Sequence, residues 1–267
     1  MRLSSPSIMG RLVVFASIVM TLAFASNRSL AADLGLVKSG TFTIAHDDSY
    51  PPFGFADKKE GRYLASQGFE IELLEKICKR MGLKAEFQPN AWAKVLVSVK
   101  LGTADAIATI GNTEERQKSY DYSEPYSEYA SKLFVLQGSK ISRLVDLEGK
   151  KVSIAKNLFS IPWIRKHYPK VDLVQLENTK EAFLALQSGK VEGAISDRLV
   201  GLYSISQDRL GGKIQATGEV FAATPVALAF AKGTKMALRE KFNSALRDIK
   251  KTEDFSLIFS KWFSEKP

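Results

Sequence analysis

Two stretches of the chain, far apart in the sequence, share one plan. VSVKLGTADAIAT (97–109) and LALQSGKVEGAISD (184–197) each read as an amphipathic helix, a glycine, two further residues, an acid and an apolar strand that ends in polar side chains. Gly102 and Gly189 stand where the C-terminal cap of a helix needs a positive φ angle. We interpret the repeat as two similar α/β blocks rather than one sheet, although a helix–glycine–strand connection is common in any α/β protein.

Strand-like and helix-like segments alternate along the rest of the chain, which favours α/β units on largely parallel sheets. We expect strands at 40–47, 83–89, 104–110, 132–137, 150–156, 171–177, 191–197 and 226–232, and helices at 70–82, 91–102 and 180–189 with two more in 236–263. Ligands of open α/β sheets bind beyond the carboxyl ends of the strands. The residues that end the strands 104–110 and 191–197 are therefore the first candidates for a site.

The N-terminus has the pattern of a secretory signal peptide. Arg2 and Arg11 precede the apolar run LVVFASIVMTLAFA, and small residues follow before a cut that we place after Ala31. The alternative is a membrane anchor, but a span needs about 20 apolar residues and this run is shorter. We expect residues 1–31 to be removed and a mature chain of about 236 residues to be exported, a length that suits one large domain or two small ones.

Charge and cysteine content exclude several classes of function. Removal of residues 1–31 takes away three arginines and no acid, which lowers the net charge from +9 to +6. The densest basic clusters are Lys-Lys pairs, so we expect no nucleic-acid partner. Cys78 is the only cysteine and lies at helical spacing with apolar residues, so we expect a buried structural thiol. With two histidines and no thiolate cluster we also expect no metal and no cofactor.

Hydroxyl and cationic side chains gather where the strand at 104–110 ends. Thr109, Thr113 and Arg116 follow one another there. An arginine pairs bidentately with a carboxylate, and hydroxyls add directional hydrogen bonds. Thr113 before two glutamates also has the pattern of a helix N-cap, with Arg116 as a solvated cation. From this segment alone the two interpretations are equally supported.

An acid stands at the corresponding end of the second block. Asp197 ends the apolar strand at 191–197 and could receive an ammonium group or cap the next helix. An arginine and an acid at the two related strand ends suit a zwitterion. A cleft between two lobes would remove water and strengthen both contacts.

Aromatic side chains follow the first strand. DDSYPPFGF (47–55) places Tyr50 and Phe53 beside a rigid Pro-Pro turn, and Trp92 opens the second helix. Aromatic walls hold the apolar or cationic part of a small ligand, although core packing is the usual fate of such residues. We favour the site for Tyr50 and Phe53 and leave both possibilities open for Trp92.

Together these motifs resemble family 3 of the bacterial periplasmic solute-binding proteins, the polar amino-acid-binding family. The resemblance runs through nearly the whole mature chain in the order YPPFGF, GFEIELLEKI, W-x9-G-x2-DAI, T-x2-R, YSEPY, LEGKKVSI, LQSGKVEGAISD and SKWF. It implies a two-lobe, type II periplasmic-binding-protein fold with a mixed, mostly parallel sheet in each lobe and two hinge crossovers near 131–135 and 222–226. Residues 32–131 with 225–267 would form lobe 1, and residues 132–224 lobe 2.

The resemblance also implies a function and a set of roles. A periplasmic receptor, expected to be a monomer, would capture an amino acid or similar zwitterion and deliver it to an inner-membrane ABC permease. Arg116 would bind the α-carboxylate, Asp197 the α-amino group, and Tyr50 and Phe53 would flank the side chain. The remaining contacts would come from Asp47, Trp92, Thr109 and Thr113.

The chain departs from this family at two places. Gly111 stands where the family usually has a hydroxyl, and Asn157-Leu158 followed by Phe159 stands where it usually has a Gly-Thr or Gly-Ser pair. A backbone N–H of Gly111 and the amide of Asn157 could still donate, while Leu158 and Phe159 would make the pocket more apolar. The class of ligand therefore stays open.

Two rival functions fit the same fold. Some relatives are cyclohexadienyl or arogenate dehydratases, which need a general acid over the substrate ring. His46 and Glu115 are the conspicuous candidates here, and His46 fits a hydrogen-bonded structural residue better. A sensor subunit that reports the ligand to a membrane signalling protein would use the same closure. We expect the receptor and no enzyme.

Overall fold

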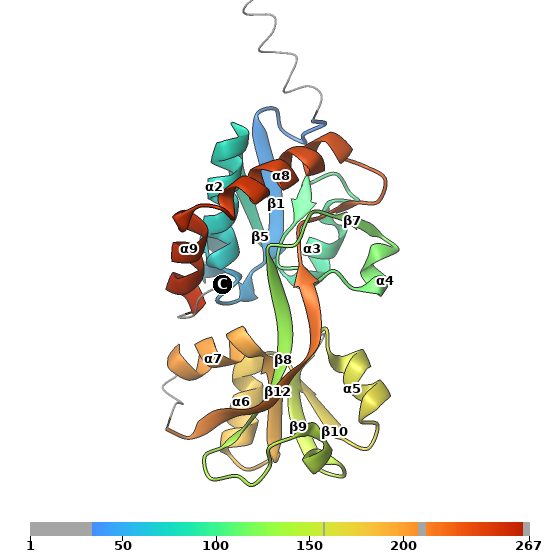
Figure 1. Ribbon diagram of the computed structural model, residues 1–267, viewed down its shortest axis with the longest axis vertical. Coiled ribbons are helices and arrows are strands. Elements are labelled where there is room, and N and C mark those ends of the chain that lie inside the picture. The colour runs from blue at the N-terminus through green and yellow to red at the C-terminus, as the bar shows by residue number, and fades with distance from the viewer. Residues whose placement is uncertain (1–33, 157, 208–211, 264–267) are drawn as a thin grey trace, which may run out of the picture.

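The computed structural model describes residues 34–156, 158–207 and 212–263. The expected signal peptide at 1–31 and Asn157 lie outside these residues. Two α/β lobes, one above the other in Figure 1, are joined by two long strands that run between them. The upper lobe carries one five-stranded sheet and the lower lobe another.

The sheet of the upper lobe has the strand order β5-β1-β6-β13-β7. Its strands are β1 (Thr41–Asp47), β5 (Lys84–Asn90), β6 (Ala106–Ile107), β7 (Tyr120–Tyr122) and β13 (Ala229–Ala231). β1 lies between β5 and β6 and is parallel to both, whereas β13 is antiparallel to β6 and β7. The carboxyl ends of β1 and β6 therefore meet at the same edge of this sheet, above the lower lobe.

Helices from both ends of the chain cover this sheet. They are α2 (Phe69–Met81), α3 (Trp92–Ser98), α4 (Glu114–Gln117), α8 (Met236–Ile249) and α9 (Glu253–Phe263). α2 buries the apolar stripe that its helical spacing predicts and ends at Gly82, whose φ of 71° caps the last turn. Cys78 is buried in this stripe, as expected, and burial raises the pKa of its thiol to about 12.

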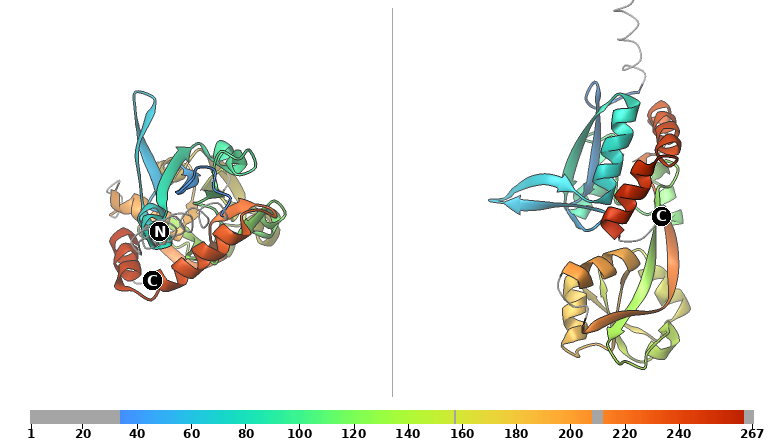
Figure 2. Two further views of the ribbon diagram at one scale, coloured as in Figure 1. Left: turned by 90° about the horizontal axis from the view of Figure 1, so that it is seen from above. Right: turned by 60° about the vertical axis from the view of Figure 1, so that its left-hand side comes forward.

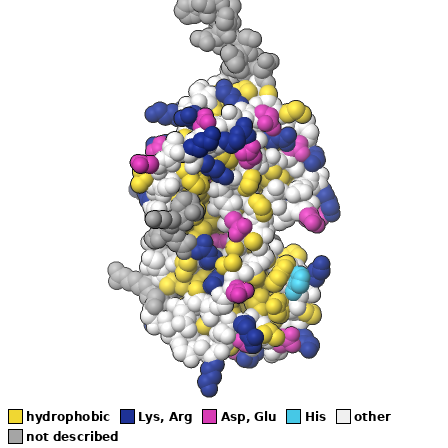
Figure 3. All heavy atoms as spheres, in the orientation of Figure 1, with side chains coloured by type: hydrophobic (Ala, Val, Ile, Leu, Met, Phe, Trp, Pro, Cys, Tyr) yellow, Lys and Arg dark blue, Asp and Glu magenta, His cyan; other side chains and the backbone are white. Residues whose placement is uncertain are grey.

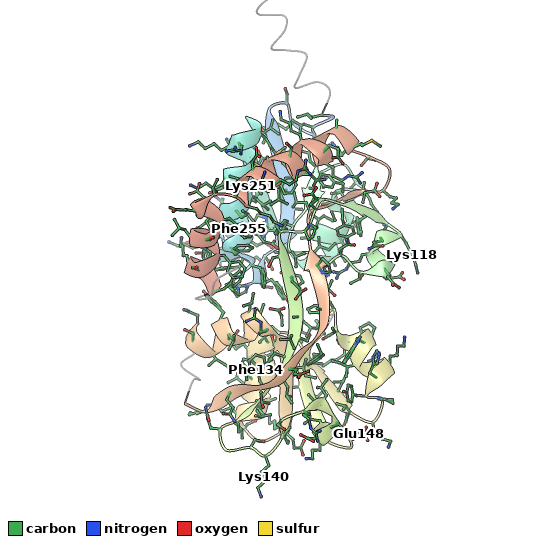
Figure 4. The ribbon with its side chains drawn as sticks, viewed as in Figure 1. Lys118, Phe134, Lys140, Glu148, Lys251 and Phe255 are labelled. Carbon is green, nitrogen blue, oxygen red and sulfur yellow. The ribbon has the colours of Figure 1, made fainter. Side chains whose placement is uncertain are left out.

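The sheet of the lower lobe has the order β10-β9-β11-β8-β12. Its strands are β8 (Ser127–Leu136), β9 (Lys151–Ala155), β10 (Asp172–Leu176), β11 (Gly193–Asp197) and β12 (Ile214–Val226), with the helices η1 (Leu144–Leu147), α5 (Ile161–His167), α6 (Thr179–Gln187) and α7 (Arg198–Gln207). Figure 4 shows Phe134 among these strands, where its ring packs on Phe183, while Lys140 points outward. Gly102 and Gly189 have φ angles of 69° and 70°, as the repeated plan predicts.

β8 and β12 pair with each other and carry the chain between the two sheets. β12 returns at 222–226, as expected, and Val226 already bridges to Gly111 of the upper lobe. The first crossover lies earlier than predicted, because Ser131 to Phe134 are paired with β11 in the lower sheet. The pairing of β8 with β12 is interrupted twice, and Ala222 has a φ of 51° there, so this part of the hinge is irregular.

A second difference from the expected elements is a small sheet of the upper lobe that lies on the side opposite α8 and α9. β2 (Ser49–Tyr50), β3 (Gly54–Lys59) and β4 (Arg62–Gln67) form an antiparallel sheet whose β3–β4 hairpin projects from the lobe in Figure 2. The charged segment 57–62 has no hydrophobic alternation, so the period-2 signal of a strand is absent from it. None of the described helices is long and apolar enough to cross a membrane.

Candidate functional site

A cavity of about 780 Å³ lies between the two lobes. Its walls come from the carboxyl ends of β1 and β6 and from α3 and α4 above, and from the segments after β9 and β10 and from α7 below. On the face shown in Figure 3, hydrophobic side chains gather at the level where the lobes meet. Of the predicted site residues, six line the cavity: Asp47, Tyr50, Trp92, Thr109, Arg116 and Leu158.

Arg116 is held in this cavity from the short helix α4. Thr113 caps that helix by accepting a hydrogen bond from the Arg116 N–H at 3.3 Å. The guanidinium Nη1 donates to the Gly111 carbonyl at 3.1 Å, and the guanidinium carbon lies 5.3 Å from the centre of the Trp92 ring. No carboxylate of the described chain pairs with Arg116, so this cation lines the cavity with donors to spare.

Thr109 is fixed at the end of β6 in a left-handed conformation with a φ of 56°. Its N–H donates to Glu70 Oε2 at 2.6 Å, and its hydroxyl donates to the Ala108 carbonyl and accepts from the Asp47 N–H. Glu70 is fully buried, and burial raises the pKa of its carboxyl to about 8. The sequence motif GFE places this acid on α2 but does not reveal that it holds the strand end.

Two acids follow β1 at the upper wall. The Asp47 carboxylate accepts from the Ser49 N–H at 2.9 Å and from the Ser49 hydroxyl, and burial raises the pKa of this group. Asp48, by contrast, is paired with Lys58 at 2.8 Å and with the Tyr63 hydroxyl at 2.6 Å. Asp47, unlike Asp48, therefore has no cationic partner among the described residues.

The aromatic pair of the YPPFGF motif is divided between site and core. Tyr50 lines the cavity, whereas Phe53 differs from the expectation: it is fully buried and packs on Phe69 and Phe263. The turn between the two residues directs one ring to the cavity and the other to the lobe's interior. Phe53 therefore supports Tyr50 from behind, with the rings 5.9 Å apart and nearly parallel.

Asp197 caps the next helix in this structure. Its Oδ1 accepts from the Leu199 and Val200 N–H groups, and its Oδ2 accepts from the Ala130 N–H at 3.0 Å. It is 1% exposed and is not among the residues that line the cavity. Burial raises the pKa of Asp197 to about 7. Its hydrogen bonds to the backbone of Ala130 and Val200 place the carboxylate next to Tyr129 and Val200, which line the cavity.

Gly111 and Thr113 hold the arginine without lining the cavity themselves. A Cβ added to Gly111 would lie 2.8 Å from the Thr224 Cγ2 on the hinge strand β12, so the missing hydroxyl has a steric cause. In the lower lobe Leu158 lines the cavity, and Asn157 lies outside the described residues. Phe159 also lines the cavity, as its expected place beside Leu158 implies, and Tyr129, Lys156 and Glu177 line it without having been predicted as site residues.

The two candidate acids for a dehydratase do not stand over the cavity. His46 is fully buried, with Nδ1 within 2.7 Å of the Asp47 carbonyl and Nε2 within 2.7 Å of the Ser66 hydroxyl. Glu115 is exposed and pairs with Lys118 on the surface, which points away from the body of the lobe in Figure 4. Neither is positioned to protonate a group bound beside Arg116.

Two α/β lobes, two connecting strands and a charged, aromatic cavity between them define the class of bilobal ligand-binding proteins. The chain belongs to the bacterial extracellular solute-binding proteins, family 3, whose model matches residues 42–265. The family predicted from the motifs is thus confirmed, and with it the two-lobe, type II fold with a mixed sheet in each lobe.

Relatives of known name bind amino acids for ABC transporters. The chain is 32% identical to the ABC transporter glutamine-binding protein GlnH of Bacillus subtilis, over 80% of this chain and 78% of that protein. It is 27% identical to the L-cystine-binding protein TcyJ of Escherichia coli K12, over 92% and 93% of the two chains. Both relatives are named as binding proteins.

Solved structures of similar fold include three with different roles. An ancestral arginine-binding protein bound to glutamine is 34% identical, with a TM-score of 0.71 over 85% of this chain and all of that one. A histidine kinase sensor domain is 26% identical, with a TM-score of 0.74 over 85% and 98% of the chains. An ancestral amino acid-binding protein that is a precursor of cyclohexadienyl dehydratase is 28% identical, with a TM-score of 0.71 over 84% and 96%.

Proposed function

We propose that this chain is an exported periplasmic receptor that captures an amino acid, or a similar small zwitterion, and delivers it to an ABC permease of the inner membrane. The observation that carries the proposal is Arg116, a cation that lines the interlobe cavity without a carboxylate partner among the described residues. Asp47 supplies to the same cavity an acid that no described cation pairs with. Opposite charges left uncompensated in one cavity suit a ligand that brings both of their partners.

The binding step follows from these positions. The ligand carboxylate pairs with Arg116, whose fork suits a planar anion, while Trp92 holds the guanidinium from one side. The ammonium group, or a cationic side chain, faces Asp47. Asp197 keeps one acceptor site on Oδ2 for an ammonium group that reaches the wall next to Tyr129 and Val200.

Closure of the lobes completes the site. The upper lobe, expected as residues 32–131 with 225–267 but with its first boundary now before Ser131, would move against the lower lobe, expected as 132–224, about the irregular pairing of β8 with β12. Closure would exclude water and strengthen the contacts of Arg116 and Asp47 with the ligand. The closed complex is what the permease would receive, from a monomer that needs no cofactor and no nucleic acid.

A sensor subunit remains the second candidate, because a histidine kinase sensor domain shares this fold at 26% identity. The same cavity and closure serve both roles, so the receptor is preferred on the names of the curated relatives. A dehydratase is the weaker candidate, since His46 and Glu115 lie outside the cavity. Prephenate turnover by the purified chain would support the dehydratase over the receptor.

The experiment that tests the proposed function is a thermal-shift screen of the mature chain against the standard amino acids, opines, polyamines and small carboxylates. A ligand at about 100 times its Kd stabilises by about 2.7 kcal/mol, which raises the Tm of a chain of this size by about 5–10 °C. We expect at least one amino acid to give such a shift. A screen in which only compounds without a carboxylate shift the Tm would contradict the role given to Arg116.

A further inference from the structure

Three aromatic rings form a continuous wall across the cavity, from one lobe to the other. Tyr50 belongs to the upper lobe, Tyr129 to the crossing strand β8, and Phe159 to the segment after β9 in the lower lobe. The rings of Tyr50 and Tyr129 meet edge to face at 5.4 Å, and those of Tyr129 and Phe159 are stacked at 5.7 Å with an interplanar angle of 24°. All three residues line the cavity.

At Tyr129, the middle ring of the three, the wall presents ring surface to the cavity and no polar atom. Tyr129 is 3% exposed, its hydroxyl is buried without a hydrogen-bond partner in the described chain, and so the ring is the part that reaches the cavity. Its position is fixed from behind by Phe53, at a centroid distance of 4.8 Å. Phe159 is half-buried and leaves part of its ring to the cavity.

Apolar side chains extend this wall on the lower lobe. Leu158, from the segment after β9, and Val200 of α7 line the cavity together with Phe159. A polar group of a ligand placed against this surface would lose its water and gain no hydrogen bond, which costs free energy. A flat apolar ring placed there would gain both area burial and ring-to-ring contacts.

Charged partners for the ends of a ligand lie elsewhere in the same cavity, at Arg116 and Asp47. We propose that Tyr129 and Phe159 are specificity-determining residues that select an aromatic amino acid over small or polar ones. The ring of the ligand lies along the Tyr50–Tyr129–Phe159 wall while its carboxylate pairs with Arg116. This inference rests on the proposed function, since it assigns the ligand class of the same cavity.

Calorimetry with L-phenylalanine and L-alanine as probes tests this assignment on the wild type and on Phe159→Leu. The wild type binds L-phenylalanine at least about 10-fold more tightly than L-alanine. Phe159→Leu keeps an apolar residue but removes the ring. It therefore lowers the affinity for L-phenylalanine by about 3- to 10-fold and the affinity for L-alanine by less than about twofold. Because Phe159 is half-buried, the variant is expected to fold, and its melting curve verifies this.

Phe221→Leu is the matched control. Phe221 is also a half-buried ring of the lower lobe, stacked on Trp163 at 5.4 Å, but it does not line the cavity. This variant keeps both affinities within about twofold of the wild type. Equal losses for both probes in Phe159→Leu, or the same selective loss in Phe221→Leu, would overturn the specificity role.

The outcomes also separate this inference from the function on which it rests. Wild-type protein that binds L-alanine or L-serine as tightly as L-phenylalanine overturns the aromatic selectivity and leaves the receptor standing. Wild-type protein that binds an opine but no aromatic amino acid likewise overturns only the selectivity, and wild-type protein that binds no zwitterion of the screen overturns both.

Discussion

At the scale of single residues, Gly111 shows why this chain lacks a hydroxyl beside the arginine. The nearest atom to a Cβ added at this position is the Cγ2 of Thr224, at 2.8 Å, and Tyr129 Cδ2 follows at 3.5 Å. Thr224 belongs to β12, whose Val226 bridges to Gly111, so the two segments cannot separate without loss of this pairing. Gly111 thus lets the hinge strand approach the segment that holds Arg116.

Gly111→Ser is expected to lower the free energy of unfolding by about 1–3 kcal/mol, because the added side chain overpacks against Thr224. Thr224→Ala removes the clashing methyl group, so the double variant should recover most of this loss. Urea unfolding of both single variants and the double variant measures the coupling. Strictly additive losses would show that Thr224 is not the obstacle.

Glu70 gives a second prediction at this scale, in the pH dependence of stability. Its carboxyl pKa rises from 4.5 to about 8 on burial, so the folded state retains a proton that the unfolded chain releases. The free energy of unfolding therefore falls as the pH rises from about 4.5 to about 8, on the order of a few kcal/mol, and stays level above that. The raised pKa of Asp197 also makes the free energy of unfolding fall as the pH rises, but only up to about pH 7.

In Glu70→Gln the free energy of unfolding should no longer fall between pH 7 and 8. The amide carbonyl can still accept the Thr109 N–H, and no proton is exchanged. Unfolding curves of wild type and variant between pH 5 and 9 give the comparison. A variant whose stability falls between pH 7 and 8 as steeply as that of the wild type would contradict the assignment to Glu70.

At the scale of elements, the hydrophobic pattern predicted the parts with a clear period and missed the irregular ones. α2, β1 and β9 lie within one or two residues of their expected bounds, because each has a regular apolar period. β12 was not among the expected strands: the strand expected at 226–232 corresponds to β13, and only a crossover was expected near 222–226. Gly218 and Pro225 interrupt any alternation in β12, and its strand form depends on pairing with β8. α7 was expected only as the alternative in which Asp197 caps a following helix, because small and polar residues dilute its apolar face.

α7 packs on the sheet of the lower lobe through its glycine, which supplies a prediction at this scale. A Cβ on Gly201 would lie 2.2 Å from the Cζ of Phe134, a fully buried ring with no room to move. Gly201→Ala should lower the free energy of unfolding by at least about 2 kcal/mol, since overpacking outweighs the gain in helix propensity. Leu202→Ala, a partly exposed neighbour, is the control and should cost less; chemical unfolding of both measures the difference.

The candidate site was predictable only where chain order places residues at strand ends. Asp47 ends β1, and Thr109 and Arg116 follow β6. Because β1 and β6 are parallel neighbours, the sheet brings these residues together. Tyr50 and Phe53 stand three residues apart in a turn. Because a turn has no hydrophobic periodicity, the sequence does not predict which of the two rings faces the cavity. Tyr129 and Phe159 reach the cavity through the arrangement of the two lobes, and this arrangement is not encoded in any local pattern.

At the scale of the whole molecule, the two lobes share apolar contacts at the base of the cavity. Leu199 and Val200 of α7 join the core cluster of the upper lobe, and Phe159 packs on both lobes' clusters. Charged side chains occupy other parts of the same cavity. A ligand that closes the lobes therefore meets an apolar base and the pair of charges at Arg116 and Asp47.

The most decisive measurement is calorimetric titration of Arg116→Ala with the amino acid that gives the largest thermal shift on the wild type. Removal of the buried partner of a bound carboxylate costs about 3–5 kcal/mol of binding free energy. The affinity of Arg116→Ala for the amino acid should therefore fall by at least about 100-fold. Lys118→Ala, which removes an exposed cation paired with Glu115 directly after the same helix, should bind within about twofold of the wild type. Wild-type affinity in a folded Arg116→Ala protein would contradict capture of the ligand carboxylate by this arginine.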